Sequence, residues 1–199
     1  MTRRRRKKKR GFKTAITVVF LLLLATVILM ATGVISELKK NIDRKFYPLE
    51  HENAILKASE DYDMDPAFIC AVIFTESKFR EDASSSAGAQ GLMQLMPETF
   101  EYLAEKRGEE TPEDITAPEV NIDYGVYYLR YMTDTYGFED LYTTCAAYNA
   151  GPGAVTSWLK NEEYSKDGKT LYKIPYNETK NYIEKIKKAE QMYQTLYFE

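Results

Sequence analysis

The sequence is poor in the two residue types that most often bind transition metals or form crosslinks. Its 199 residues include one histidine, His51, and two cysteines, Cys70 and Cys145. One imidazole cannot hold a metal ion by itself, so we expect no metal site. Two cysteines are too few for a disulfide framework. Both lie in apolar segments, which predicts buried free thiols, although a bridge is chemically allowed outside the cell.

Acidic residues are absent before Glu37. Residues 1–13 carry nine lysines or arginines, whereas the rest of the chain carries the other 18 basic residues and all 30 acidic ones, a net charge of −12. A nucleic-acid-binding domain needs its positive charge on the folded part. Because only the amino-terminal tail is basic, we expect no nucleic-acid partner.

Charge of either sign is absent from residues 14–35, a stretch of 22 residues. As a helix it would be about 33 Å long, enough for a hydrocarbon core of about 30 Å. A cleaved signal peptide has a shorter apolar stretch of about 7–15 residues. The pattern predicts one transmembrane signal anchor, with the basic tail over residues 1–13 in the cytoplasm. We therefore expect a single-pass protein of the cell membrane, with a stalk over residues 36–48 and an extracellular domain over residues 49–199.

The proposed extracellular domain reads as mainly α, with proline near helix starts and glycine after helix ends. Helices are predicted over residues 49–62, 66–77, 97–106, 118–137, 141–149 and 178–197, with a short one around Val155 and Trp158 and a loop over residues 80–90. Asp167-Gly168 could turn a small β-hairpin between residues 163–166 and 169–172. No convincing β-sheet is found.

One carboxylate, Glu76, has an unusual position. It ends a predicted helix in which residues 67–74 are all apolar. Burial and the negative end of the helix dipole both raise the pKa of such a group, which favours a general acid. A glutamate that ends a helix is more often a solvated surface group. A glycosidase ordinarily needs a second carboxylate about 5–9.5 Å away. Asp65, Glu81 and Asp82 offer no compelling partner.

Three other segments combine small residues with amides and phenols. They are Gly88–Gln94, Ala147–Gly151, and the pair Glu178 and Tyr182 one turn apart. Amides and phenols hydrogen-bond the acetamido and hydroxyl groups of sugars. Of the 16 tyrosines, 14 lie from Tyr102 onward, and this excess suits a sugar groove, although many must belong to the core.

Taken together, these segments resemble the soluble lytic transglycosylase (SLT) catalytic domain, a lysozyme-like fold that acts on peptidoglycan. The resemblance covers residues 47–192. Four motifs occur in the family's order: Glu76-Ser77, Gly88-Ala89 with Gly91–Gln94, Ala147–Gly151, and Glu178-Thr179 with Tyr182. Residues 121–125 also look like part of the family's long helix. The implied fold is a lysozyme-like helical domain.

The resemblance implies that Glu76 is the sole catalytic acid and base. It would protonate the β-1,4 glycosidic oxygen between N-acetylmuramic acid and N-acetylglucosamine. It would then take a proton from the muramoyl 6-hydroxyl, which closes on C1 to give a 1,6-anhydro end. No cofactor is implied, and no second carboxylate is required.

The resemblance also implies substrate-binding residues on either side of Glu76. Ser77 would orient Glu76 or a sugar, and Met93 and Gln94 would line the groove. The other four would contact the acetamido group, the developing charge, the substrate backbone or Glu76 itself: Tyr148, Asn149, Glu178 and Tyr182. The expected partners are peptidoglycan glycan strands and, through the amino-terminal helix, the membrane. We expect a monomer.

Two alternatives stay open at this point. One is a hydrolytic, goose-type-lysozyme-like muramidase, which would need a positioned water and an aspartate that the sequence does not place. The other is a non-enzymatic, membrane-anchored peptidoglycan-binding or scaffold protein, against which the intact Glu76 argues.

Overall fold

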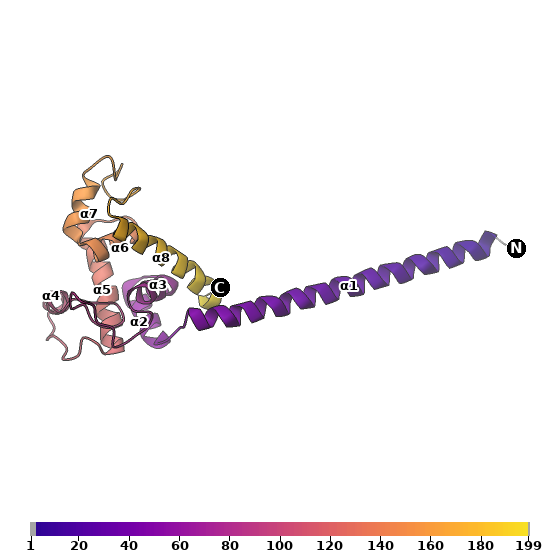
Figure 1. Cartoon of the computed structure of the whole chain (residues 1–199), viewed down its shortest axis with the longest axis horizontal. Helices are drawn as coiled ribbons and strands as arrows, with labels where there is room; N and C mark the ends of the chain where they lie inside the picture. Colours follow the sequence, from indigo (N-terminus) through magenta and orange to yellow (C-terminus); the bar gives the residue numbers. More distant parts are fainter. Residues whose placement is uncertain (1–2, 199) are drawn as a thin grey trace. The chain divides into compact units, whose positions relative to one another are not determined.

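The computed structural model describes residues 3–198, without the side chains of residues 3–16, 25, 27, 29 and 31. The chain divides into two units, Met1–Phe46 and Tyr47–Glu199 (Figure 1).

The described part of the first unit is one continuous helix, α1 (Arg3–Phe46). It includes residues 3–13 of the predicted basic tail, the predicted membrane span and most of the predicted stalk. Within the side chains that the structure describes, no helix is long and apolar enough to cross a membrane. The predicted single-pass topology therefore stays a prediction. The span predicted over residues 14–35 falls partly on side chains outside the description, at residues 14–16, 25, 27, 29 and 31.

The second unit is helical, as the sequence predicts. Its helices are α2 (Glu52–Tyr62), α3 (Pro66–Glu76), α4 (Pro97–Arg107), α5 (Pro118–Tyr136), α6 (Leu141–Ala150), α7 (Pro152–Leu159) and α8 (Asn177–Tyr193), followed by the π-helical turn η1 (Gln194–Phe198).

Local sequence signals explain where these helices begin and end. Asp65 caps α3 by accepting a hydrogen bond from the backbone amide of Ala67 at 2.7 Å, and Asp140 caps α6 in the same way. Helices α4 and α5 each begin with proline. They end where Gly108 and Gly137 adopt the left-handed region, with φ of 70° and 68°. These caps place α3 and α6, which carry much of the candidate site.

Helix α3 lies at the centre of the domain because nearly all of its surface is apolar. Residues 67–73 are all buried. It packs most extensively on α8 and also contacts α2, and the contacts continue from α2 to α5, from α5 to α6 and from α6 back to α8 (Figure 1). Cys70 and Cys145 are free and buried in this core, as predicted.

The predicted β-hairpin near residues 163–172 is wrong. Within residues 3–198 the structure has no strand, only isolated antiparallel bridges that join Gln90 to Ser84 and to Leu95. The carboxylate of Asp167 accepts hydrogen bonds from the backbone amides of Lys169 and Thr170, both at 2.8 Å. These side-chain bonds take the place of a strand ladder, since an aspartate can compete for the backbone groups of its own turn.

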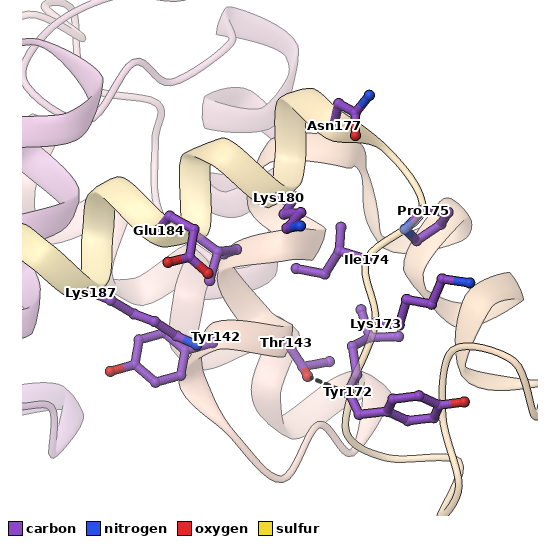
Figure 2. Close-up of a pocket in the computed structure, with 12 residues that line it drawn as sticks. Tyr142, Thr143, Tyr172, Lys173, Ile174, Pro175, Asn177, Lys180, Glu184 and Lys187 are labelled. Carbon is purple, nitrogen blue, oxygen red and sulfur yellow. Dashed lines mark hydrogen bonds between the residues drawn. The ribbon is translucent and has the colours of Figure 1, made fainter.

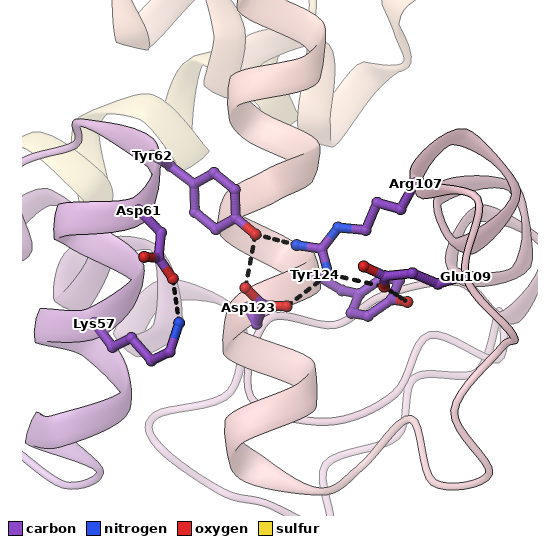
Figure 3. A network of polar contacts seen from close by, with 7 residues as sticks. All are labelled: Lys57, Asp61, Tyr62, Arg107, Glu109, Asp123 and Tyr124. Atoms are coloured by element: carbon purple, nitrogen blue, oxygen red, sulfur yellow. Dashed lines mark hydrogen bonds and ion pairs between the residues drawn. The ribbon is translucent and has the colours of Figure 1, made fainter.

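A polar cluster centred on Arg107 joins α2, α4 and α5 (Figure 3). The guanidinium donates to the Asp123 carboxylate at 2.7 Å, and Tyr62 donates to the other oxygen of the same carboxylate at 2.7 Å. The guanidinium carbon also lies 4.3 Å from the ring centre of Tyr124 and 4.4 Å from that of Tyr127. This cluster is mutually satisfied, which indicates a structural role.

Candidate active site

Glu76 is the last residue of α3, where that buried helix reaches the surface of the core. The side chain is partly buried. Tyr182 of α8 donates a hydrogen bond from its hydroxyl to Oε1 of Glu76 at 2.6 Å. Because α3 packs along α8, a residue 106 positions away in the sequence holds this carboxyl group.

The environment raises the pKa of Glu76 to about 7, from an ordinary value of 4.5. Burial is the larger effect, because it penalises the charged form. The hydrogen bond from Tyr182 acts in the opposite direction, because it stabilises the carboxylate. Among the described residues, no charged side chain contributes to the shift. The predicted upward direction is therefore present, and its cause is desolvation.

Two phenols flank the carboxyl group. Burial, followed by the nearby charge of Glu76, raises the pKa of Tyr148 and of Tyr182 well above the usual range, so both hydroxyls are neutral donors. Tyr148, on α6, donates to the backbone carbonyl of Met93 at 2.6 Å. Its ring also lies against that of Tyr128, with 5.3 Å between ring centres. The structure thus brings Glu76, Tyr148 and Tyr182 together from three helices.

The loop before α4 is held by Asn121, a residue to which the sequence reasoning gave no individual role. Asn121 is 0% exposed. Its side-chain oxygen accepts from the Met93 amide at 2.7 Å, and its nitrogen donates to the carbonyls of Gln90 at 3.1 Å and Ile115 at 2.7 Å. The available sequence signal was an amide between the apolar residues Val120 and Ile122. This side chain fixes the loop that carries Met93 and Gln94.

The sequence predicts that Met93 and Gln94 line the groove, but in the structure both side chains make contacts within the domain. Met93 is 0% exposed, so its side chain belongs to the core and only its backbone carbonyl meets Tyr148. The side-chain nitrogen of Gln94 donates to the carbonyls of Ala83 at 3.0 Å and Gly91 at 2.9 Å. The amide nitrogen of Gln94 therefore stabilises its own loop.

The remaining predicted residues lie on α6, on α8 and at the end of α3. Asn149 is exposed, and its side-chain oxygen accepts from the Thr179 hydroxyl at 2.8 Å. This contact with Thr179 leaves the amide nitrogen of Asn149 as the group to face a ligand. Glu178 is exposed in the first turn of α8. Ser77 is buried and donates to the Ile73 carbonyl at 3.2 Å, back along its own helix.

Among the described residues, no other acid contributes to the pKa of Glu76. Asp65 caps the opposite end of α3. Glu81 pairs with His51, with 3.1 Å between Oε1 and Nε2. In the described part of the chain, no group of three or more histidine, cysteine or acidic residues could hold a metal ion. The site thus offers one carboxyl group of raised pKa, two neutral phenols and an amide, which is a set suited to acid–base chemistry on a polar, uncharged substrate.

Comparison with known proteins relates the chain to transglycosylases, both by a family model and by individual relatives. A family model described as "Transglycosylase SLT domain" matches residues 53–171. The chain is 30% identical over 160 residues to the soluble lytic murein transglycosylase of Salmonella typhimurium, across 77% of this chain and 24% of that protein. It is 31% identical over 172 residues to membrane-bound lytic murein transglycosylase C of Haemophilus influenzae, across 75% of this chain and 47% of that protein.

Solved structures are similar in fold. The lytic transglycosylase Slt of Pseudomonas aeruginosa, solved as an inactive glutamate-to-glutamine mutant, is 29% identical with a TM-score of 0.66, across 75% of this chain and 24% of that one. A complex of a 70-kDa soluble lytic transglycosylase with bulgecin A is 25% identical with a TM-score of 0.69, across 79% of this chain and 26% of that one. The chain spans about a quarter of the length of the soluble relatives.

Proposed function

The chain belongs to the Transglycosylase SLT domain family, and on that premise we propose that it cleaves peptidoglycan as a lytic transglycosylase. The observation that carries the proposal is the environment of Glu76, which is partly buried at the end of α3 and bonded to Tyr182. This environment raises the pKa of Glu76 to about 7, and no second carboxylate among the described residues contributes to the shift. The relatives named lytic murein transglycosylases support the same activity.

In the first step Glu76 acts as a general acid. Its proton passes to the β-1,4 glycosidic oxygen between N-acetylmuramic acid and N-acetylglucosamine, and the bond from C1 to that oxygen breaks. A pKa near 7 leaves about half of the carboxyl groups protonated at neutral pH, and this matches the requirement for a proton donor. Tyr182 holds Oε1, so the second oxygen is the one left to carry the proton.

In the second step the same group acts as a base. The carboxylate takes the proton of the muramoyl 6-hydroxyl, whose oxygen bonds to C1 and closes the 1,6-anhydro ring. The reaction is therefore non-hydrolytic, and it needs neither an activated water nor a protein nucleophile. An inactive glutamate-to-glutamine mutant is known for the relative from Pseudomonas aeruginosa, and this supports dependence on one glutamate.

The neighbouring groups bind and orient the substrate. Tyr148 and Asn149 are proposed to contact the acetamido group or the developing positive charge, with Thr179 fixing the amide of Asn149. Glu178 and the Gln94 loop are proposed to border the groove, while Ser77 and Met93 support it from the core. All of these groups come from one chain, so we propose that a monomer is sufficient and that no cofactor takes part.

Product analysis tests this proposal. The full chain is incubated with purified peptidoglycan, and the released muropeptides are measured by mass spectrometry. We expect 1,6-anhydro ends, each lighter by one water molecule than a hydrolytic end. Reducing ends would instead support the muramidase alternative, and no released product would support a binding or scaffold protein.

A substitution tests the role of Glu76. Glu76→Gln keeps the shape of the side chain but removes its titration, and we expect cleavage to fall by at least about 100-fold. Thermal unfolding of the variant serves as the control for folding. Unchanged cleavage by a folded variant would refute the assignment.

Peptidoglycan lies outside the cytoplasmic membrane, so the proposed activity requires export of the domain. We propose that the basic residues of the tail and the uncharged stretch over residues 14–35 direct this export, as their sequence indicates. Relatives named membrane-bound lytic murein transglycosylases support action at the envelope.

A further inference from the structure

A cavity of about 390 Å³ lies between α6, α8 and the segment of residues 171–175 (Figure 2). This volume falls within the range of about 300–1,000 Å³ that is usual for ligand pockets. Its lining includes Tyr142, Ile174, Lys180, Ile183, Glu184 and Lys187. The proposed reaction uses none of them.

The cavity and Glu76 lie on different sides of α8. Lys180, Glu184 and Lys187 are spaced by four and three residues, so they share one face of the helix. Tyr182, which contacts Glu76, is two residues from Glu184 and points to a nearly opposite face, since each residue turns the helix by about 100°. The cavity is thus a second site, separated from the acid–base group by the thickness of a helix.

The two lysines of this face are available to a ligand. Both are exposed, and neither takes part in an ion pair within residues 3–198 of the structure. The ammonium of Lys187 lies 4.6 Å from the ring centre of Tyr142, whose hydroxyl donates to Glu190 at 2.7 Å. Lys173, in contrast, pairs with Glu163, and its ammonium points away from the cavity in Figure 2.

Glu184 lies between the two lysines and on the cavity side of α8 (Figure 2). The face therefore presents a positive, a negative and again a positive group over two helical turns, about 10.5 Å. Apolar side chains of Ile174 and Ile183 lie beside them in the same cavity. A polyanion would meet repulsion from Glu184, whereas a ligand with alternating charges would match all three groups.

From this charge pattern we propose that the cavity binds a short peptide in which an ammonium group lies between two carboxylates. An extended peptide covers about 3.3–3.6 Å per residue, so roughly three residues match the span from Lys180 to Lys187. The stem peptide of peptidoglycan has this chemistry, with a free amino group on its diamino acid and carboxylates on either side. The identity of the peptide rests on the proposed function, whereas the charge pattern does not.

Calorimetric titration of the full-length chain with free L-alanyl-γ-D-glutamyl-meso-diaminopimelyl-D-alanine tests the proposal at low ionic strength. We expect binding by the unaltered chain and about tenfold weaker binding when Lys180→Gln and Lys187→Gln are combined. Lys106→Gln combined with Lys160→Gln is the matched control, since it removes the same two charges at exposed residues that lie outside the cavity and outside α8. It should change neither peptide binding nor glycan cleavage, and thermal unfolding checks that each variant is folded.

Glu184→Gln distinguishes a site for a zwitterionic peptide from a simple anion site. We expect it to weaken binding of the peptide. It should not weaken binding of the same peptide when the side-chain amino group of the diaminopimelyl residue is acetylated. Absence of binding, equal loss in the Lys106→Gln, Lys160→Gln control, or binding of inorganic phosphate as tight as that of the peptide would each overturn the proposal. Glu76→Gln should still bind the peptide, so failure of the proposed function and failure of this site give different results.

Discussion

Replacing Tyr182 with phenylalanine tests the electrostatic account of Glu76. The change removes one hydroxyl, which donates to the Glu76 carboxylate at 2.6 Å, and leaves the aromatic ring in place. Among the described residues, that hydrogen bond is the only influence that lowers the pKa of Glu76, against the larger effect of burial. Without it, burial acts alone, and the pKa must rise above about 7.

The size of the shift follows from the hydrogen bond. A hydrogen bond to a charged group contributes about 1.5–3 kcal/mol, and one pKa unit corresponds to about 1.4 kcal/mol. We therefore expect Tyr182→Phe to raise the pKa of Glu76 by about one unit or more. Since the first step needs protonated Glu76, the alkaline limb of the pH–rate profile should move upward by the same amount.

Stability gives a second readout with a defined sign. The pKa of Glu76 is higher in the folded chain than its ordinary value, so its contribution to stability is present in full below about pH 4.5 and is lost as the pH rises through about 7. The loss amounts to roughly 3 kcal/mol for the unaltered chain. In Tyr182→Phe the loss should grow by about 1.4 kcal/mol and extend to higher pH.

The assay combines glycan cleavage with chemical unfolding, each measured across pH for the unaltered chain and the variant. An alkaline limb that stays in place or moves downward in a folded variant would refute the electrostatic account. So would a free energy of unfolding whose pH dependence is the same in both proteins.

Two further predictions concern packing and export. Gly125→Ala should lower the free energy of unfolding by about 1–3 kcal/mol, because the new Cβ would lie 2.3 Å from the sulfur of Met93. Gly153→Ala, on α7 with open space around it, should be neutral or stabilising in the same denaturant titration, and equal losses would contradict the packing argument. For export, protease added to intact cells should digest the domain over residues 47–199, and a fully protected domain would contradict the proposed location.

Much of the fold could be predicted because its signals are local. Helix α3 begins after the cap Asp65, with Pro66 as its first residue, and α5 ends at Gly137. These signals depend only on interactions between neighbouring residues. The predicted hairpin failed for a reason that is also local but less visible. Asp167 satisfies the backbone amides of its own turn, and the Asp-Gly pair on which the prediction rests does not reveal that competition.

The candidate site was predicted unevenly for a related reason. The raised pKa of Glu76 follows from the apolar helix that it ends, so it could be expected from eleven residues of sequence. The bond from Tyr182 and the role of Asn121 depend on contacts between distant segments. Met93 is predicted to line the groove, but its side chain is buried in the core. Gly125, which contacts it in space, leaves room for this side chain because it has no Cβ.

Among the described residues, no second carboxylate contributes to the pKa of Glu76, and this is consistent with the chemistry proposed for it. A group that must give a proton in one step and take one in the next works best with a pKa near the working pH. A neighbouring acid would push the pKa of Glu76 further up, and a neighbouring cation would lower it, so each would favour one step over the other. Burial opposed by one phenol brings the pKa to about 7 without either. In the described residues, an apolar helix and a single hydroxyl therefore provide the balance that a two-carboxylate site obtains from paired charges.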